Sequence, residues 1–131
     1  MRSLAHTRLI EGGLGKEFLK AFALSGARSL AVIDVDLPLA QQACREIRSA
    51  VKQELGVHDD EVAQVNAWEC DVTNKDGVYQ TIHEIGTKFG GSIDVFVGAA
   101  GICENIPALE YPIDNFKRVT KRKMTALTLG I

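Results

Sequence analysis

The sequence predicts an α/β fold, in which helices flank a parallel sheet of about four strands. Compact apolar runs, each about as long as a buried strand, alternate with longer segments whose apolar residues recur every three or four positions. Gly and Pro separate many of these segments at positions typical of helix ends and first turns. Parallel strands joined by helical crossovers account for this order of elements.

The length and composition indicate a single globular domain. The chain has 131 residues, of which 46% are hydrophobic and 24% charged, and this balance excludes disordered and collagen-like classes. The net charge of −2 predicts neither nucleic acid nor a membrane as a partner. No apolar stretch approaches the ~20 residues of a membrane span. Polar residues interrupt the N-terminal segment, so we expect no signal peptide and a cytoplasmic location.

The cysteines and histidines are too scattered for a disulfide framework or a metal site. Their number and spacing match neither pattern, and we expect no bound metal. They are Cys44, Cys70, Cys103, His6, His58 and His83.

The first ten residues fit a buried strand poorly. A doubly wound sheet begins with a central apolar strand that leads into a Gly-rich turn. Here His6 and Arg8 would point into a sheet that is covered on both faces. The first strand is therefore the doubtful element of the predicted fold.

Three amphipathic helices are expected. The first begins at Leu14 and ends near Gly26, with a face formed by Leu14, Phe18, Ala21, Phe22 and Ser25. The second has Pro38 in its first turn and ends at Gly56; its buried positions are Leu39, Ala43, Ile47, Ala50, Val51 and Leu55. The third is capped by Thr73 or Asn74 and ends at Gly90, and its apolar side consists of Val78, Ile82, Ile85 and Phe89.

Three further strands are expected between and after these helices. They span residues 29–33, 62–70 and 93–97. Within the second of them, Trp68 and Cys70 share one face, and Val65 and Ala67 lie on the other. The last strand opens into a Gly-rich loop over residues 98–101.

A Gly-rich turn precedes the first helix. Gly12, Gly13 and Gly15 would let backbone N–H groups approach a phosphate at the helix N-terminus. Taken alone, such glycines more often mark an ordinary N-terminal turn.

Four segments in one order resemble the nucleotide-binding half of the short-chain dehydrogenase/reductase family. They are Glu-Gly-Gly-Leu-Gly at 11–15, Ala-Val-Ile-Asp at 31–34, Cys-Asp-Val-Thr at 70–73 and Val-Gly-Ala-Ala-Gly-Ile at 97–102. The resemblance covers roughly residues 12–119 and implies a partial Rossmann-like doubly wound sheet that binds NAD(P). Three positions depart from the family pattern: Arg8 and Leu9 replace the Thr and the first Gly of the turn, and Ala99 replaces an Asn.

The resemblance assigns roles to individual residues. Asp34 would accept the adenosine ribose hydroxyls and disfavour a 2′-phosphate, which implies NAD rather than NADP. Asp36 is the alternative ribose acceptor, and either Asp could instead be a helix cap. Asp71 and Val72 would contact adenine, although an Asp there could simply be a charge at a helix N-terminus. The remaining cofactor-binding candidates are Gly12, Gly13, Leu14, Gly15, Ala99, Ala100 and Gly101.

The catalytic Ser and Tyr-x-x-x-Lys of the family have no counterpart in this sequence. An unperturbed Tyr is a poor base at neutral pH, so the Lys is essential to the chemistry. Tyr79 is followed at the fourth position by His83, and Tyr111 by Asn115. We therefore assign no catalytic residue and expect no independent turnover. Residues 101–107 look like those of family members that act on polyols and ketoses.

The C-terminal segment departs from the family pattern after Val119. We expect a truncated NAD(P)-binding domain over residues 1–119 and a basic and apolar tail over 120–131. Three interpretations stay open: an oxidoreductase half that needs other residues, a nucleotide- or partner-binding module that pairs with a full-length relative, and a fragment without function. The basic cluster is expected to be solvated and comprises Lys117, Arg118, Lys121, Arg122 and Lys123.

Overall fold

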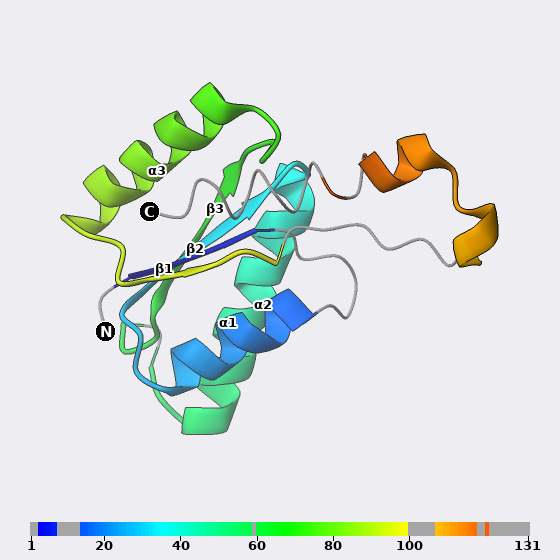
Figure 1. The fold of residues 1–131 in the computed structure, drawn as a ribbon. Helices are drawn as coiled ribbons and strands as arrows, with labels where there is room; N and C mark the ends of the chain where they lie inside the picture. The colour runs from blue at the N-terminus through cyan, green and yellow to red at the C-terminus, as the bar shows by residue number, and fades with distance from the viewer. Residues whose placement is uncertain (1–2, 8–13, 59, 100–106, 118–119, 121–131) are drawn as a thin grey trace.

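A four-stranded parallel sheet forms the centre of the protein. The computed structural model describes the whole chain except residues 1–2, 8–13, 59, 100–106, 118–119 and 121–131. The sheet has the order β3-β2-β1-β4, and each neighbouring pair of strands is parallel (Figure 1). The strands are β1 (Ser3–Thr7), β2 (Ser29–Asp34), β3 (Gln64–Glu69) and β4 (Val95–Val97).

The first strand, which the sequence left in doubt, is formed and lies inside the sheet. His6 pairs with Val32 of β2 on one side and with Val97 of β4 on the other. A central strand makes ladder hydrogen bonds on both sides, and this tertiary context outweighs a weak local pattern. Residues 3–7 therefore form the central strand that the doubly wound fold requires.

The helices cover both faces of the sheet. They are α1 (Leu14–Leu24), α2 (Leu37–Leu55) and α3 (Lys75–Phe89). In Figure 1, α1 and α2 lie on one face and α3 lies on the other. Each parallel pair of neighbouring strands is thus connected through a crossover, as the alternation of segments predicted.

The larger core lies between the sheet and the α1–α2 layer. Its central side chains, including Leu19, Leu30 and Ile47, are 0–1% exposed. The expected face of α1 is wrong by about one residue: the helix buries Gly15, Leu19 and Ala23, whereas Leu14 and Phe18 are 75% and 43% exposed. Both sets follow the same helical spacing, so spacing alone cannot tell which of them faces the sheet.

The buried face of α2 was predicted in its main positions. Ala43, Ile47 and Val51 are buried as expected. Leu55 is 51% exposed instead, because it lies at the end of the helix beyond the edge of the core. Ala40 and Cys44 complete the buried stripe.

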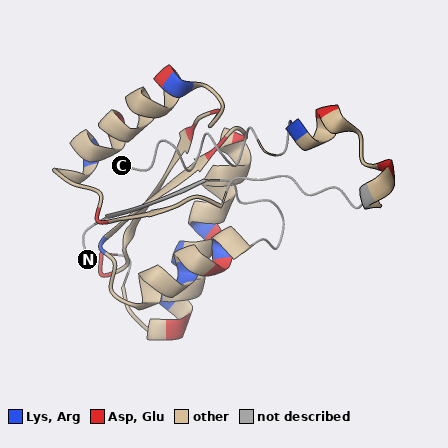
Figure 2. Ribbon diagram, viewed as in Figure 1, with Lys and Arg blue, Asp and Glu red and all other residues tan. Residues whose placement is uncertain are grey.

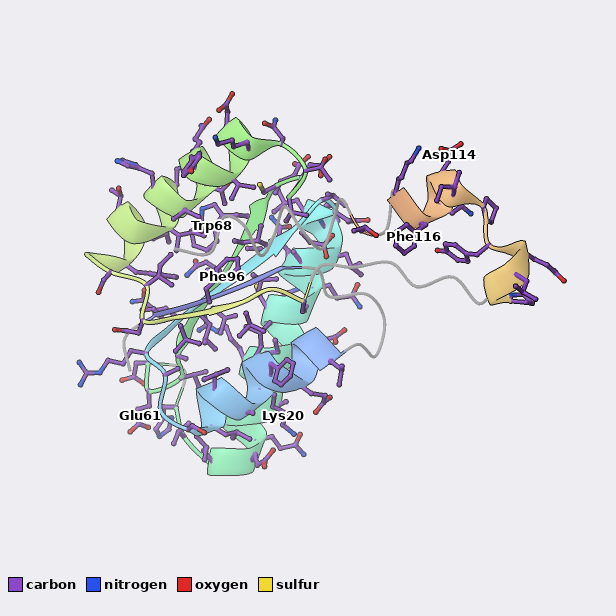
Figure 3. The ribbon with its side chains drawn as sticks, viewed as in Figure 1. Lys20, Glu61, Trp68, Phe96, Asp114 and Phe116 are labelled. Atoms are coloured by element: carbon purple, nitrogen blue, oxygen red, sulfur yellow. The ribbon has the colours of Figure 1, made fainter. Side chains whose placement is uncertain are left out.

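The smaller core lies between the sheet and α3. Ile85 is fully buried there, and the Trp68 and Phe89 rings meet edge to face with their centroids 5.7 Å apart. Figure 3 shows Trp68 and Phe96 on this side of the sheet. The predicted faces of β3 are confirmed, since Trp68 and Cys70 join this cluster while Val65 and Ala67 pack in the other.

The predicted helix ends are confirmed. The Asn74 side chain accepts a hydrogen bond from the Gly77 N–H, which identifies Asn74 as the N-cap of α3. Gly56 and Gly90 follow α2 and α3 with φ of +63° and +72°. That left-handed conformation is readily adopted by glycine and stops a helix.

A short segment after β4 projects from the sheet (Figure 1). It contains a 3₁₀ helix, Ala108–Glu110, and helical residues that begin at 113. Ile113 and Phe116 of this segment are 64% and 55% exposed.

A membrane span needs a long apolar helix, and none of the helices in the described residues meets that requirement.

Candidate nucleotide-binding site

The predicted site residues gather at the carboxyl edge of the sheet. Because all four strands are parallel, β2, β3 and β4 end on the same side, and Asp34 is in register with Glu69. Ligands of open α/β sheets bind at this edge. Figure 2 shows charged residues along the helices and near the ends of the strands, while the strands themselves are largely uncharged.

Asp34 is the only charged residue among the described ones that is buried, with 3% exposure. It is the last residue of β2, and its carboxylate accepts a hydrogen bond from the Asp36 N–H at 3.1 Å. A buried carboxylate must be satisfied by hydrogen bonds or charge. The bond from Asp36 holds the carboxylate at the edge of the sheet, where β2 gives way to the loop before α2.

Asp36 has a different role. Its carboxylate accepts a hydrogen bond from the Leu39 N–H at 2.9 Å, and its backbone is extended, as is typical of an N-cap. The structure thus gives Asp36 a capping function, and Asp34 keeps the position expected of a ribose acceptor.

Asp71 lies in a tight turn directly after β3. Its carboxylate accepts hydrogen bonds from both the backbone N–H and the hydroxyl of Thr73, at 2.9 and 2.8 Å. Thr73 is a positioning residue that the sequence reasoning did not identify in this role. The Asp-x-Thr spacing was the available signal, because Asp side chains commonly bond the backbone two residues further on.

The Gly-rich turn is described only in part. Gly12 and Gly13 lie outside the described residues. Leu14 is the first residue of α1 and is largely exposed, whereas Gly15 is buried. The first backbone N–H groups of α1 have no partner within the helix, as at every helix N-terminus.

The loop after β4 is also described in part. Ala99 is half-buried, and its N–H donates to the Val97 carbonyl at 3.2 Å. Ala100 and Gly101 lie outside the described residues. Val72, beside Asp71, is half-buried.

The two described cysteines are free and buried. Burial raises the pKa of the Cys70 thiol and raises the pKa of Cys44 to about 11. Both thiols are therefore protonated at neutral pH, so neither is an activated nucleophile. Among the residues that the structure describes, no three His, Cys, Asp or Glu side chains are grouped as metal ligands would be.

Taken together, the described residues place hydrogen-bonding groups at one edge of the sheet. The buried Asp34 carboxylate and the Asp71 turn end neighbouring strands, and α1 begins at residue 14. In the part of the chain that the structure describes, no cluster of metal ligands accompanies these groups.

The comparisons with known proteins agree with this geometry. The sequence model of a family described as short chain dehydrogenase matches residues 10–131. A D-arabinitol 2-dehydrogenase (ribulose-forming) from Candida tropicalis is 33% identical over 111 residues, which are 84% of this chain and 39% of that protein. An NADH-dependent L-xylulose reductase from Ambrosiozyma monospora is 27% identical over 110 residues, again 84% of this chain and 39% of that protein.

A solved structure gives the same picture. A short-chain type dehydrogenase/reductase from Mycobacterium marinum superposes with a TM-score of 0.74 at 28% identity, covering 98% of this chain and 46% of that one. The chain thus spans about two fifths of the length of the curated relatives that it matches.

Proposed function

The chain belongs to the short-chain dehydrogenase family, and from this membership we propose that residues 1–119 form the adenosine-binding side of an NAD site. The family binds NAD(P). The observation that carries the proposal is the buried Asp34 carboxylate at the end of β2, held by the Asp36 N–H. NAD, when bound, accepts or donates the hydride; the residues described here bind and orient it.

The proposed contacts follow the carboxyl edge of the sheet. The N-terminus of α1 faces the pyrophosphate, where backbone N–H groups favour an anion. The Asp71 turn would contact adenine, and the residues after β4 would lie on the nicotinamide side. The proposed binding residues are Gly12, Gly13, Leu14, Gly15, Asp34, Asp71, Val72, Ala99, Ala100 and Gly101.

We propose NAD over NADP as the cofactor. An NADP 2′-phosphate would meet the Asp34 carboxylate, and repulsion between the two anions would oppose binding. Asp36 offers no substitute, because its carboxylate caps α2. The relative whose name states a cofactor is NADH-dependent, which supports the same choice.

Turnover is proposed to need residues that these 131 do not contain. Neither Tyr79 nor Tyr111 has a Lys at the fourth following position, and Tyr79 is 53% exposed on α3. The family chemistry would act on polyols or ketoses, as the names of the two curated relatives suggest. We propose a cytoplasmic setting, where the free thiols would stay reduced.

A thermal melt with and without cofactor tests the binding proposal. A ligand at 100 times its dissociation constant adds about 2.7 kcal/mol to stability. We expect NAD to raise the melting temperature clearly and NADP to raise it little. A cooperative melt that neither nucleotide shifts would contradict the proposal.

Exposed apolar residues favour a second candidate, a contact with another polypeptide. Leu109, Ile113 and Phe116 are 103%, 64% and 55% exposed on the projecting segment. Figure 3 labels Phe116 there, away from the sheet. We propose a full-length family member as this partner. Sedimentation of the chain with such a relative would reveal a complex, which Phe116→Asp should weaken.

A further inference from the structure

A groove runs along the outer edge of β3, between α2 and α3. It encloses about 420 Å³ and is lined by four consecutive strand residues, 65–68, together with Gln41, Cys44 and Arg45 of α2 and Lys88 of α3. It lies on the flank of the sheet, so an inference about it does not depend on the proposed nucleotide site.

The floor of the groove is the open edge of a strand. The Gln64 and Cys70 N–H groups donate to Arg28 and Asp34 carbonyls on the β2 side, at 2.8 and 2.9 Å. Backbone groups alternate sides along a strand, so the N–H and C=O of Val65, and likewise of Ala67, point outward. No described residue pairs with these groups. An unpaired edge of this kind is a template for another strand.

The rim of the groove is cationic. Arg45 and Lys88 line it from opposite helices, and no acidic residue is among the lining residues. Neither cation forms an ion pair with another described residue, whereas Lys16 and Lys20 of α1 are paired with Glu46 and Glu54. Two cations outside any such ion pair, placed beside an open strand edge, select an extended chain that carries carboxylates.

We propose that this groove binds an extended acidic polypeptide segment, which adds to the sheet as a strand beside β3. Backbone hydrogen bonds to Val65 and Ala67 give affinity, and carboxylates at Arg45 and Lys88 give selectivity. A second copy of this chain is a poorer occupant, because pairing two β3 edges would bring two cationic rims together.

The test uses a synthetic peptide, acetyl-Thr-Glu-Val-Glu-Ile-Glu-Val-Thr-amide, and the same peptide with Lys in place of Glu. Trp68 is the only tryptophan in the chain and lines the groove, so its fluorescence reports binding directly. We expect the acidic peptide to bind at least about tenfold more tightly than the basic one. Equal binding of the two peptides, or no binding of either, would overturn the proposal.

Amide hydrogen exchange tests the mode of binding. The acidic peptide should slow exchange at the outward Val65 and Ala67 N–H groups by at least about tenfold. Binding without this protection would show that the peptide sits on the rim and does not add as a strand, which would overturn the proposal equally.

Matched charge reversals test the role of the rim. The double variant Arg45→Glu, Lys88→Glu should reverse the preference and bind the basic peptide. The control Arg48→Glu, Lys75→Glu changes the same helices by the same charge at residues outside the groove lining. The control should bind the acidic peptide within about twofold of wild type. If both double variants lost affinity for the acidic peptide equally, net charge alone would explain the loss. That result would contradict the role assigned to Arg45 and Lys88.

Discussion

The Cys70 N–H donates a hydrogen bond of 2.9 Å to the Asp34 carbonyl, which joins the end of β2 to the residue after β3. This bond continues the sheet ladder for one residue beyond Glu69, the last residue of β3. It places the Asp34 and Asp71 segments at the same edge of the sheet. The two carboxylates to which we assign ribose and adenine contacts are thus positioned by backbone bonding.

Asp34→Asn should weaken NAD binding by about tenfold, a loss of about 1.4 kcal/mol. The amide oxygen can still accept the Asp36 N–H, so the loop should keep its shape while the charge is lost. Because the carboxylate also repels a 2′-phosphate, the same change should raise the affinity for NADP relative to NAD. Calorimetric titration of both nucleotides checks this. Unchanged NAD affinity in a folded variant would remove Asp34 from the site.

Asp36→Ala should lower the free energy of unfolding by about 1 kcal/mol and leave NAD affinity unchanged. The substitution removes the N-cap bond to the Leu39 N–H. Asp36→Ser is the matched control, because a serine hydroxyl can cap the helix in its place. Urea denaturation measures the stability of the three proteins. A loss of NAD affinity in the Ser variant would show that the Asp36 carboxylate binds the ribose.

Stability should fall as pH rises from about 9 to 11, in part because of Cys44. Burial raises the pKa of its thiol to about 11 in the folded state, from 9.0. Between these values the unfolded thiol ionises while the folded one stays protonated, so raising the pH favours unfolding. Cys44→Ala should flatten this part of the curve.

To test the role of Cys44, the free energy of unfolding is measured against pH for the wild type and for Cys44→Ala. The slopes of these two curves are then compared. Lysine and tyrosine groups titrate in both proteins and therefore largely cancel. The cavity left by the substitution costs a similar amount at every pH, so it shifts the curve without changing its slope. Parallel curves would show that the Cys44 thiol does not contribute.

Leu19→Ala should destabilise the protein by about 2–5 kcal/mol, whereas Phe116→Ala should change stability by less than about 0.5 kcal/mol. Leu19 is fully buried between α1 and the sheet, and its loss leaves a cavity. Phe116 is 55% exposed on the projecting segment. Guanidinium denaturation measures both, and a large loss from Phe116→Ala would show that it packs in a core.

Most of the fold could be predicted because its signals are local. Helix ends at Gly56 and Gly90 depend on a backbone conformation that favours glycine, and the two faces of β3 follow from the alternation of side chains along a strand. Two features could not be predicted because they are set by neighbours. β1 is held by ladders on both sides. The rotation of α1 is decided by what lies beneath it, since Leu14 and Leu19 belong to two equally spaced apolar sets.

The sequence predicted where the residues of the candidate site lie, but it did not predict the hydrogen bonds that they form. The sequence placed Asp34 and Asp71 after neighbouring strands, and the structure puts both at the carboxyl edge. Which of Asp34 and Asp36 faces a ligand was left open, because both follow the same strand. The structure separates them by burial and by bonding, because Asp34 is 3% exposed whereas the exposed Asp36 caps α2 through the Leu39 N–H.

The central position of β1 also bears on synthesis. The strand pairs Leu4 with Leu30 and with Val95, so its second partner leaves the ribosome long after the first. Closing so distant a contact costs more chain entropy than the local pairings do. The β1–β2–β3 part of the sheet can therefore assemble early, while β1 keeps one side unsatisfied until translation reaches residues 95–97. During that interval the nascent chain has an open central strand, which is the moment when a chaperone would protect it best.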